Sequence, residues 1–235
     1  MSISDNIARI RERIAQAAAR VGRNPDSITL MAVSKTVEPE RIRQAYAAGI
    51  RVLGENRVQE FADKAPALKD LAQAEWRLIG HLQSNKANRA AELFHAVDSI
   101  DSLRLAQRLH HAAQQSGKIL PVLLEINVGG EESKSGVSAS AAGLEELLRG
   151  MQDFSHLQVR GLMTIPPYTE DPQGARPYFR ALHELRDKIA GRNLPRIQMD
   201  ILSMGMSHDF EVAIEEGSTC IRVGTAIFGE RPRPQ

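Results

Sequence analysis

The sequence predicts an α/β fold, a single (β/α)8 barrel of the TIM type with an extra N-terminal helix. Short segments that read as buried strands recur eight times along the chain. Helical patterns between them are long enough for the crossovers that parallel neighbouring strands require. A length of 235 residues also suits one α/β barrel. A doubly wound open sheet has a similar rhythm with fewer strands, and the prediction therefore depends on the strand count.

The N-terminal segment, within residues 1–22, predicts an amphipathic helix. Its apolar side chains recur at spacings of three and four, namely Ile3, Ile7, Ile10, Ile14, Ala18 and Val21. Gly22 and Asn24-Pro25 then end the pattern. Such a helix needs an apolar surface to lie on.

The expected strands share a short apolar run followed by turn residues or a helical pattern. They cover residues 28–34, 51–54, 76–80, 95–100, 121–128, 159–165, 199–203 and 220–223. Helical patterns such as residues 101–116 and 175–190 lie between them. No linker or repeat divides the chain, and we expect one domain over residues 1–235 with a loose tail at 231–235.

Composition and charge exclude several classes of protein. Hydrophobic residues make up 42% of the chain and charged residues 25%, as in an ordinary globular protein. The 30 basic residues nearly balance the 29 acidic ones and form no stripe that would follow a nucleic acid backbone. Neither a signal peptide nor an apolar span is evident. We therefore expect a cytoplasmic protein whose partners include neither nucleic acid nor a membrane.

The remaining motif searches are negative. Cys220 has no cysteine partner, and its apolar strand predicts a buried, unreactive thiol. The histidines show no zinc spacing, and we expect no metal. The sequence contains no G-x-S-x-G elbow, Walker loop or Rossmann glycine fingerprint.

Lys35 is the first candidate for chemistry because it ends the first expected strand. Barrel enzymes build their sites from the carboxyl ends of the strands. Lys35 shares the parity of Met31 and Val33, and it points toward the barrel axis if Val33 does. An isolated lysine at such a position more often extends its amine into water. Its neighbours therefore decide between the two interpretations.

Two adjacent loops after the last strands carry small polar residues. The seventh strand runs into Ser203-Met204-Gly205-Met206-Ser207, and the eighth into Gly224-Thr225. Strands seven and eight are neighbours in a barrel, where such loops commonly bind phosphate. Each loop alone is also ordinary turn chemistry. Together they indicate one phosphate pocket.

The other strand ends leave alternatives open. Arg222 lies between Ile221 and Val223, and its side chain either faces water or points into the barrel. Asn56 and His81 follow the second and third strands, where they either line a pocket or cap helices.

Several long motifs together identify a family resemblance. They are Ala32-Val33-Ser34-Lys35, Gly54-Glu55-Asn56-Arg57-Val58-Gln59-Glu60, Gly80-His81-Leu82-Gln83, Leu162-Met163-Thr164-Ile165, Ser203-Met204-Gly205-Met206-Ser207 and Arg222-Val223-Gly224-Thr225. With these motifs the chain resembles the pyridoxal phosphate homeostasis protein family (YggS/PROSC). The match extends from the N-terminal helix to Phe228-Gly229-Glu230.

The resemblance implies a fold type III barrel like the N-terminal domain of alanine racemase, with pyridoxal 5′-phosphate bound to Lys35 as an aldimine. It implies that Ser207, the backbone around Met206, Gly224 and Thr225 hold the phosphate. It also places Arg222 at the pyridine nitrogen, Asn56 near the ring, and Ser203 and Met204 in the surrounding shell.

The same residues suggest what the bound cofactor does. Arg222 cannot accept a proton, and a pyridine nitrogen facing it stays unprotonated. Racemisation needs a base on each face of the substrate, and Lys35 supplies one. The racemases take the second from a tyrosine of an extra domain, whereas this chain offers Tyr46, Tyr168 and Tyr178.

We therefore expect a non-enzymatic carrier, a monomer, that delivers the cofactor to apoenzymes. The alternative is a small cofactor-dependent amino-acid racemase or a related enzyme.

Overall fold

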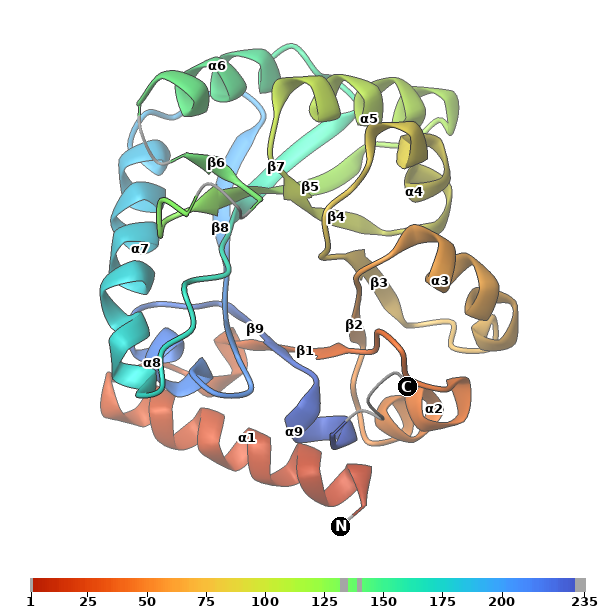
Figure 1. Ribbon diagram of the computed structural model, residues 1–235, viewed down its shortest axis with the longest axis vertical. Coiled ribbons are helices and arrows are strands. Elements are labelled where there is room, and N and C mark those ends of the chain that lie inside the picture. Colours follow the sequence, from red (N-terminus) through yellow and green to blue (C-terminus); the bar gives the residue numbers. More distant parts are fainter. Residues whose placement is uncertain (1, 132–134, 139–140, 231–235) are drawn as a thin grey trace.

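The computed structural model describes residues 2–131, 135–138 and 141–230, and Figure 1 shows their strands inside a ring of helices. The tail expected at residues 231–235 lies outside the described residues.

Eight parallel strands close into a barrel, which confirms the predicted fold. Their order is β4-β3-β2-β1-β9-β8-β7-β5, and β4 pairs with β5 to complete the ring. The short strand β6 pairs with β5 beside this ring. The strand bounds are Thr29–Val33 (β1), Val52–Glu55 (β2), Glu75–Leu78 (β3), Ala96–Ile100 (β4), Leu120–Asn127 (β5), Val137–Ser138 (β6), Leu157–Met163 (β7), Ile197–Met206 (β8) and Cys220–Val223 (β9).

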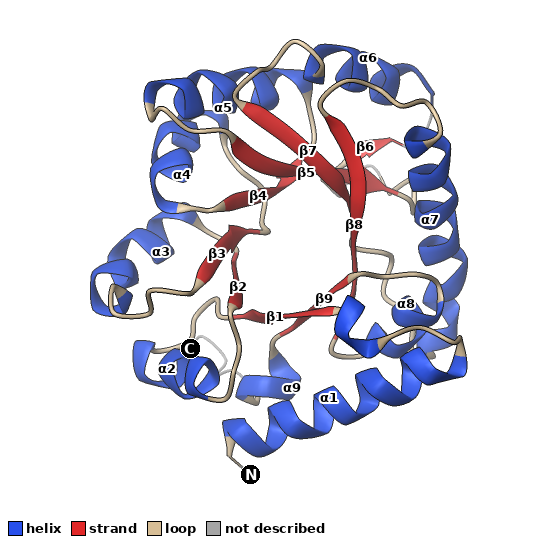
Figure 2. Ribbon diagram, turned by 180° about the vertical axis from the view of Figure 1, so that it is seen from behind, coloured by secondary structure: helices blue, strands red, loops and turns tan. Residues whose placement is uncertain are grey.

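The helices surround the strands, as seen from the opposite side in Figure 2. They are α1 (Ile3–Arg20), α2 (Pro39–Ala47), α3 (Val58–Lys64), α4 (Ala87–Leu93), α5 (Leu103–Gln115), α6 (Ala141–Met151), α7 (Arg176–Ala190), α8 (Phe210–Glu215) and α9 (Thr225–Phe228). Short 3-10 turns cover Pro25–Ser27, Ala65–Leu68, Ser84–Lys86 and Pro172–Ala175. Among the described residues, no helix is both long and apolar enough to cross a membrane.

The N-terminal helix α1 is the expected addition to the barrel. Ser2 and Asp5 form a reciprocal capping box at its start. Its apolar stripe is buried, and α1 lies across α8 and α9 in Figure 1. Val21 was expected in this stripe but is 42% exposed, because the helix ends at Arg20 and Ala17 occupies the buried face instead.

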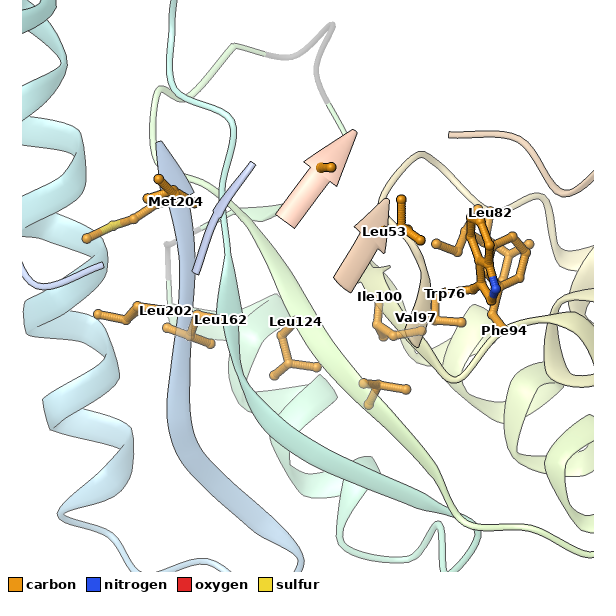
Figure 3. Close-up of a cluster of buried hydrophobic side chains, with 14 of the residues drawn as sticks. Leu53, Trp76, Leu82, Phe94, Val97, Ile100, Leu124, Leu162, Leu202 and Met204 are labelled. Carbon is orange, nitrogen blue, oxygen red and sulfur yellow. The ribbon is translucent and has the colours of Figure 1, made fainter. Parts of the chain in front are cut away.

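Apolar side chains on the outer face of the strands pack against the helices. Alternate residues of β5, such as Leu124 and Ile126, belong to this layer. Figure 3 shows Leu124, Leu162 and Leu202 of successive barrel strands in it. Their burial holds the helices on the barrel by the hydrophobic effect.

The inner face of the strands carries a different set of side chains. Met31, Val33, Ile79 and Cys220 form a separate small apolar cluster. Burial raises the pKa of the Cys220 thiol to about 11, in agreement with the predicted unreactive cysteine.

A buried ion pair also lies on strands of the barrel. Arg77 Nη2 and Nε lie 2.7 and 3.1 Å from Asp98 Oδ1, and both side chains are almost completely buried. Such a pair needs short, well-aligned contacts to offset the loss of hydration.

Strand boundaries are the part of the fold that differs from the prediction. The seventh barrel strand was expected over residues 199–203, but β8 spans Ile197–Met206. Met206 still pairs with Arg222 of β9, and the small residues that suggest a loop therefore remain in the sheet. Strand β6 was not predicted, since two residues carry no periodic signal.

Candidate functional site

A pocket of about 240 Å³ opens at the carboxyl ends of the barrel strands, and Lys35 is one of its walls. Val33 faces the barrel interior, and Lys35 follows it at the same parity, as predicted. The pocket brings together most of the predicted site residues, which are Lys35, Asn56, Met206, Ser207, Arg222, Gly224 and Thr225.

A larger cavity, about 500 Å³, lies between α1 and the amino ends of β1 and β2. Arg51, one of its lining residues, donates to the Tyr46 carbonyl at 2.8 Å and covers the Tyr46 ring at 4.2 Å. In barrels of this type, chemistry is found at the carboxyl ends of the strands. We therefore take the smaller pocket as the functional site.

The end of strand β8 is shaped by a glycine in the left-handed region. Gly205 has a φ of +92°, and a Cβ built there would lie 2.5 Å from the Ala213 Cβ. The glycine thus allows the chain to turn close against α8. Asp209 Oδ1 then accepts the Met206 N–H at 2.6 Å and fixes the turn that presents Ser207.

Ser207 joins the two loops that were predicted to bind phosphate. Its Oγ accepts the backbone N–H of Ala226, at 3.4 Å, from the start of α9. Ser207, Gly224 and Thr225 line the same pocket. Hydroxyl groups and backbone N–H groups of this kind are suited to an anion.

Arg222 points into the barrel, which resolves the alternative that the sequence left open. Its Nη1 donates to the Ser203 carbonyl and hydroxyl at 2.7 and 2.8 Å, and its Nη2 to the Thr164 carbonyl at 2.7 Å. Only 3% of the residue is exposed. Burial lowers the pKa of Arg222, and the nearby carboxyl groups, including that of Asp98, oppose this shift. A guanidinium remains charged under such conditions.

Ser203 and Met204 are adjacent in β8 and have opposite surroundings. The buried Ser203 hydroxyl accepts from Arg222 and thereby orients it. Met204 belongs to the apolar layer between strands and helices, and Figure 3 shows it directed toward the outer helices. The structure therefore does not bring Met204 to the pocket.

Asn56 reaches the pocket because its backbone packs directly on Gly80. A Cβ at Gly80 would lie 2.3 Å from the Asn56 carbonyl oxygen. His81, next in the chain, is instead directed to Asp101, with its Nδ1 3.1 Å from Asp101 Oδ2.

Sequence reasoning missed four side chains of the pocket: Val33, Ile79, Ile165 and His208. The three aliphatic residues give it apolar walls. His208 Nε2 lies 3.1 Å from the carbonyl oxygens of both Thr169 and Glu170. Its ring also packs on Tyr168, with the centroids 5.6 Å apart. Neither motif nor periodicity predicts the contacts of His208 with this loop.

Glu125 is a further residue that the sequence analysis overlooked. It alternates with the outward-facing Leu124 on β5 and is 6% exposed. Its Oε2 has no hydrogen-bond partner among the described residues. Burial and the nearby Asp101 raise the pKa of Glu125 to about 7, against the opposing effect of Arg222 and His81. A carboxyl group within a mostly apolar strand is the signal that could have identified it.

The described residues contain no group of three or more His, Cys, Asp and Glu side chains placed to hold a metal ion.

Comparison with known proteins gives consistent matches over nearly the whole chain. The family model for the N-terminal domain of alanine racemase matches residues 6–232. A pyridoxal phosphate homeostasis protein of Aquifex aeolicus is 47% identical, over 98% of this chain and 99% of that protein. The protein of the same description from Escherichia coli (strain K12) is 43% identical, over 97% of each chain.

Solved structures agree with these matches. PipY of Synechococcus elongatus, solved with PLP bound, is 36% identical with a TM-score of 0.85 and covers 97% of this chain and 100% of its own. An alanine racemase of Clostridium difficile has a TM-score of 0.71 at 14% identity, covering 97% of this chain and 57% of the racemase chain. That second likeness concerns the fold alone.

The raised pKa of Glu125 predicts a pH-dependent stability. The folded protein binds this proton more tightly than the unfolded chain, whose glutamate has the ordinary pKa of 4.5. Ionisation of Glu125 therefore lowers the free energy of unfolding as the pH rises from about 4.5 to about 7. Glu125→Gln should raise this free energy by up to about 3 kcal/mol near pH 8 and much less near pH 4.5.

Urea denaturation across this pH range measures the difference, with Glu12→Gln on the exposed face of α1 as the control. An effect of Glu125→Gln that is equal at both ends of the range would contradict the raised pKa.

Proposed function

Because the chain belongs to the pyridoxal phosphate homeostasis protein family, we propose that it binds pyridoxal 5′-phosphate through Lys35 and keeps it in reserve for other proteins. In this role it has no substantial catalytic activity of its own. The observation that carries the proposal is the convergence of Lys35, the inward Arg222 and two hydroxyl-bearing loops on one pocket.

The chemistry of the pocket fits this cofactor. Lys35 supplies the amine, and Val33, Ile79 and Ile165 supply apolar walls suited to an aromatic ring. Ser207, Thr225 and the backbone at Met206 and Gly224 would hold the phosphate. Arg222 would face the ring nitrogen with Ser203 orienting it, and Asn56 would lie at the ring. Met204 would act only through packing behind β8.

Arg222 would weaken the bound cofactor as an electron sink. Bound pyridoxal phosphate supplies an aldehyde that an amine can capture and a ring that withdraws electrons. Arg222 has no acceptor atom and remains charged, and it cannot share a proton with the ring nitrogen in the way a carboxylate does. This lowers the ability of the ring to stabilise a carbanion without abolishing it. The choice between carrier and racemase therefore rests on the second base, because racemisation needs one on each face of the substrate and Lys35 supplies one.

We further propose that the recipients are apoenzymes in the cytoplasm and that the chain acts as a monomeric single domain. Pairing of β1 with β9 and packing of α1 on α8 connect the two ends of the described chain in one unit. The large apolar residues exposed among the described residues are Val21, Ile119, Ile165 and Tyr168, which come from three separate segments. Stable dimers usually bury larger continuous apolar surfaces.

A second candidate function is a small racemase or related amino-acid enzyme, in which a second proton-exchanging group would act together with Lys35. A carboxyl group with a pKa of about 7 is able to exchange protons at neutral pH. Glu125 does not line the pocket that contains Lys35, however, and this placement favours the carrier.

Covalent capture by Lys35 is the first expected outcome. Borohydride reduction of the loaded protein should fix the cofactor's mass on the peptide that contains Lys35, and Lys35→Ala should abolish the label. Lys188→Ala, a change of an exposed lysine on α7, should leave it intact. Reduction onto a different lysine in the wild type would refute the assignment of Lys35.

Turnover distinguishes the carrier from the enzyme. The loaded protein is incubated with single L-amino acids, and the products are analysed by chiral chromatography. We expect no more than a background rate, equal in the wild type and in Glu125→Gln. Turnover above background that Lys35→Ala abolishes would overturn the carrier role, and its loss in Glu125→Gln as well would identify Glu125 as the second base.

A further inference from the structure

The backbone on both sides of Lys35 is tied to helix α3. Lys64 Nζ, at the end of α3, donates to the Ser34 carbonyl at 2.9 Å. On the other side of Lys35, the Thr36 N–H donates to the Glu60 carboxylate of the same helix. One helix therefore holds the residues directly before and after the reactive lysine.

The two contacts belong to one charged network. Lys64 Nζ lies 2.9 Å from Glu55 Oε1 and 3.2 Å from Glu60 Oε1. The Ser34 hydroxyl also donates to Glu55 Oε1, at 2.6 Å. The Lys64 and Glu55 side chains are 10% and 0% exposed. We call Glu60 and Lys64 of α3, together with Glu55 of β2, the α3 clamp.

Thr36 adopts a backbone conformation that needs such support. Its φ of +60° lies in the left-handed region, which a β-branched residue rarely adopts. Its hydroxyl donates to the Lys35 carbonyl at 2.7 Å. A strained residue of this kind persists where its surroundings hold it in place, and such residues concentrate at functional sites.

The clamp is not needed to attach α3 to the barrel. Phe61 of α3 is 2% exposed, and its ring centroid lies 4.6 Å from that of Trp76 and 4.9 Å from that of Phe94. These apolar contacts already anchor the helix. A buried ion pair adds little net stability compared with apolar side chains of similar size, which suggests that this one is retained for geometry.

We propose that the α3 clamp positions Lys35 by fixing the turn at Thr36, so that the Lys35 amine is presented to the pocket for covalent capture. This inference rests on the proposed function of Lys35. Lys64 and Glu60 act through the backbone of Ser34 and Thr36, and Glu55 acts through Lys64 and the Ser34 hydroxyl. All three are positioning residues rather than groups that contact the cofactor.

Two measurements on the purified full chain separate positioning from binding. The first is the first-order rate of capture at saturating pyridoxal phosphate, followed by absorbance and by reduction onto Lys35. The second is the dissociation constant of pyridoxine 5′-phosphate, which carries the ring and the phosphate but has an alcohol in place of the aldehyde. Only the first depends on the direction of the lysine amine.

Glu60→Ala removes the acceptor of the Thr36 N–H, and Lys64→Met removes the cation of the clamp. In both variants we expect capture to slow by about tenfold, with the affinity for pyridoxine phosphate within about twofold of the wild type. Lys64→Arg retains the charge and should recover most of the rate. Gln59→Ala is the matched control, because Gln59 directly precedes Glu60 on α3 and its side-chain amide donates to the exposed Asp63, at 2.9 Å.

Circular dichroism and thermal unfolding check that each variant folds. If Lys64→Met fails to fold, Glu60→Ala decides, since the Glu60 side chain is already 29% exposed. Unchanged capture in Glu60→Ala, or equal losses of rate and affinity, would overturn the inference while leaving the proposed function intact. A wild type that forms no Lys35 adduct would overturn both.

Discussion

A buried guanidinium joins three strands at the centre of the site. Arg222 extends from β9, and its donors meet the carbonyl and hydroxyl of Ser203 in β8 and the carbonyl of Thr164 just beyond β7. Because a buried charge is tolerated only when its donors are satisfied, these bonds fix both the guanidinium and the strand ends around it. The floor of the pocket is therefore a fixed positive charge.

The walls of the pocket are built on either side of this charge. On one side, Gly205 and Asp209 shape the loop that brings Ser207 beside Gly224 and Thr225. On the other, α3 holds the residues that flank Lys35. In the proposed function, this arrangement would place anion binding, ring recognition and covalent capture on different elements. Each element is anchored by the apolar layer between the strands and the helices.

Strong periodic patterns explain which features the sequence predicts well. The barrel strands are recognisable because each is short, apolar and followed by a crossover. The same alternation predicts the direction of Lys35 from that of Val33. The alternation does not decide the direction of Arg222. An arginine on a strand is able to face water, or to point inward where acceptors bind all of its donors. The direction of Arg222 depends on the carbonyl groups of Ser203 and Thr164, which are distant from it in sequence.

Contacts between loops are the features that the sequence does not predict. Ile165 and His208 reach the pocket through the course of their loops. Glu125 does not line the pocket, and its burial follows from its position beside the outward-facing Leu124 on β5. Met204 illustrates the opposite error: its motif resembles a site motif, yet as the neighbour of an inward Ser203 it faces the helices.

The ionisation of the ring nitrogen tests the central role of Arg222 most directly. Pyridoxal phosphate labelled with ¹⁵N in its ring, bound to the wild-type protein, should give the NMR chemical shift of an unprotonated pyridine at neutral pH. The shift of a protonated pyridinium would contradict the account, because a ring in that state cannot face the guanidinium of Arg222.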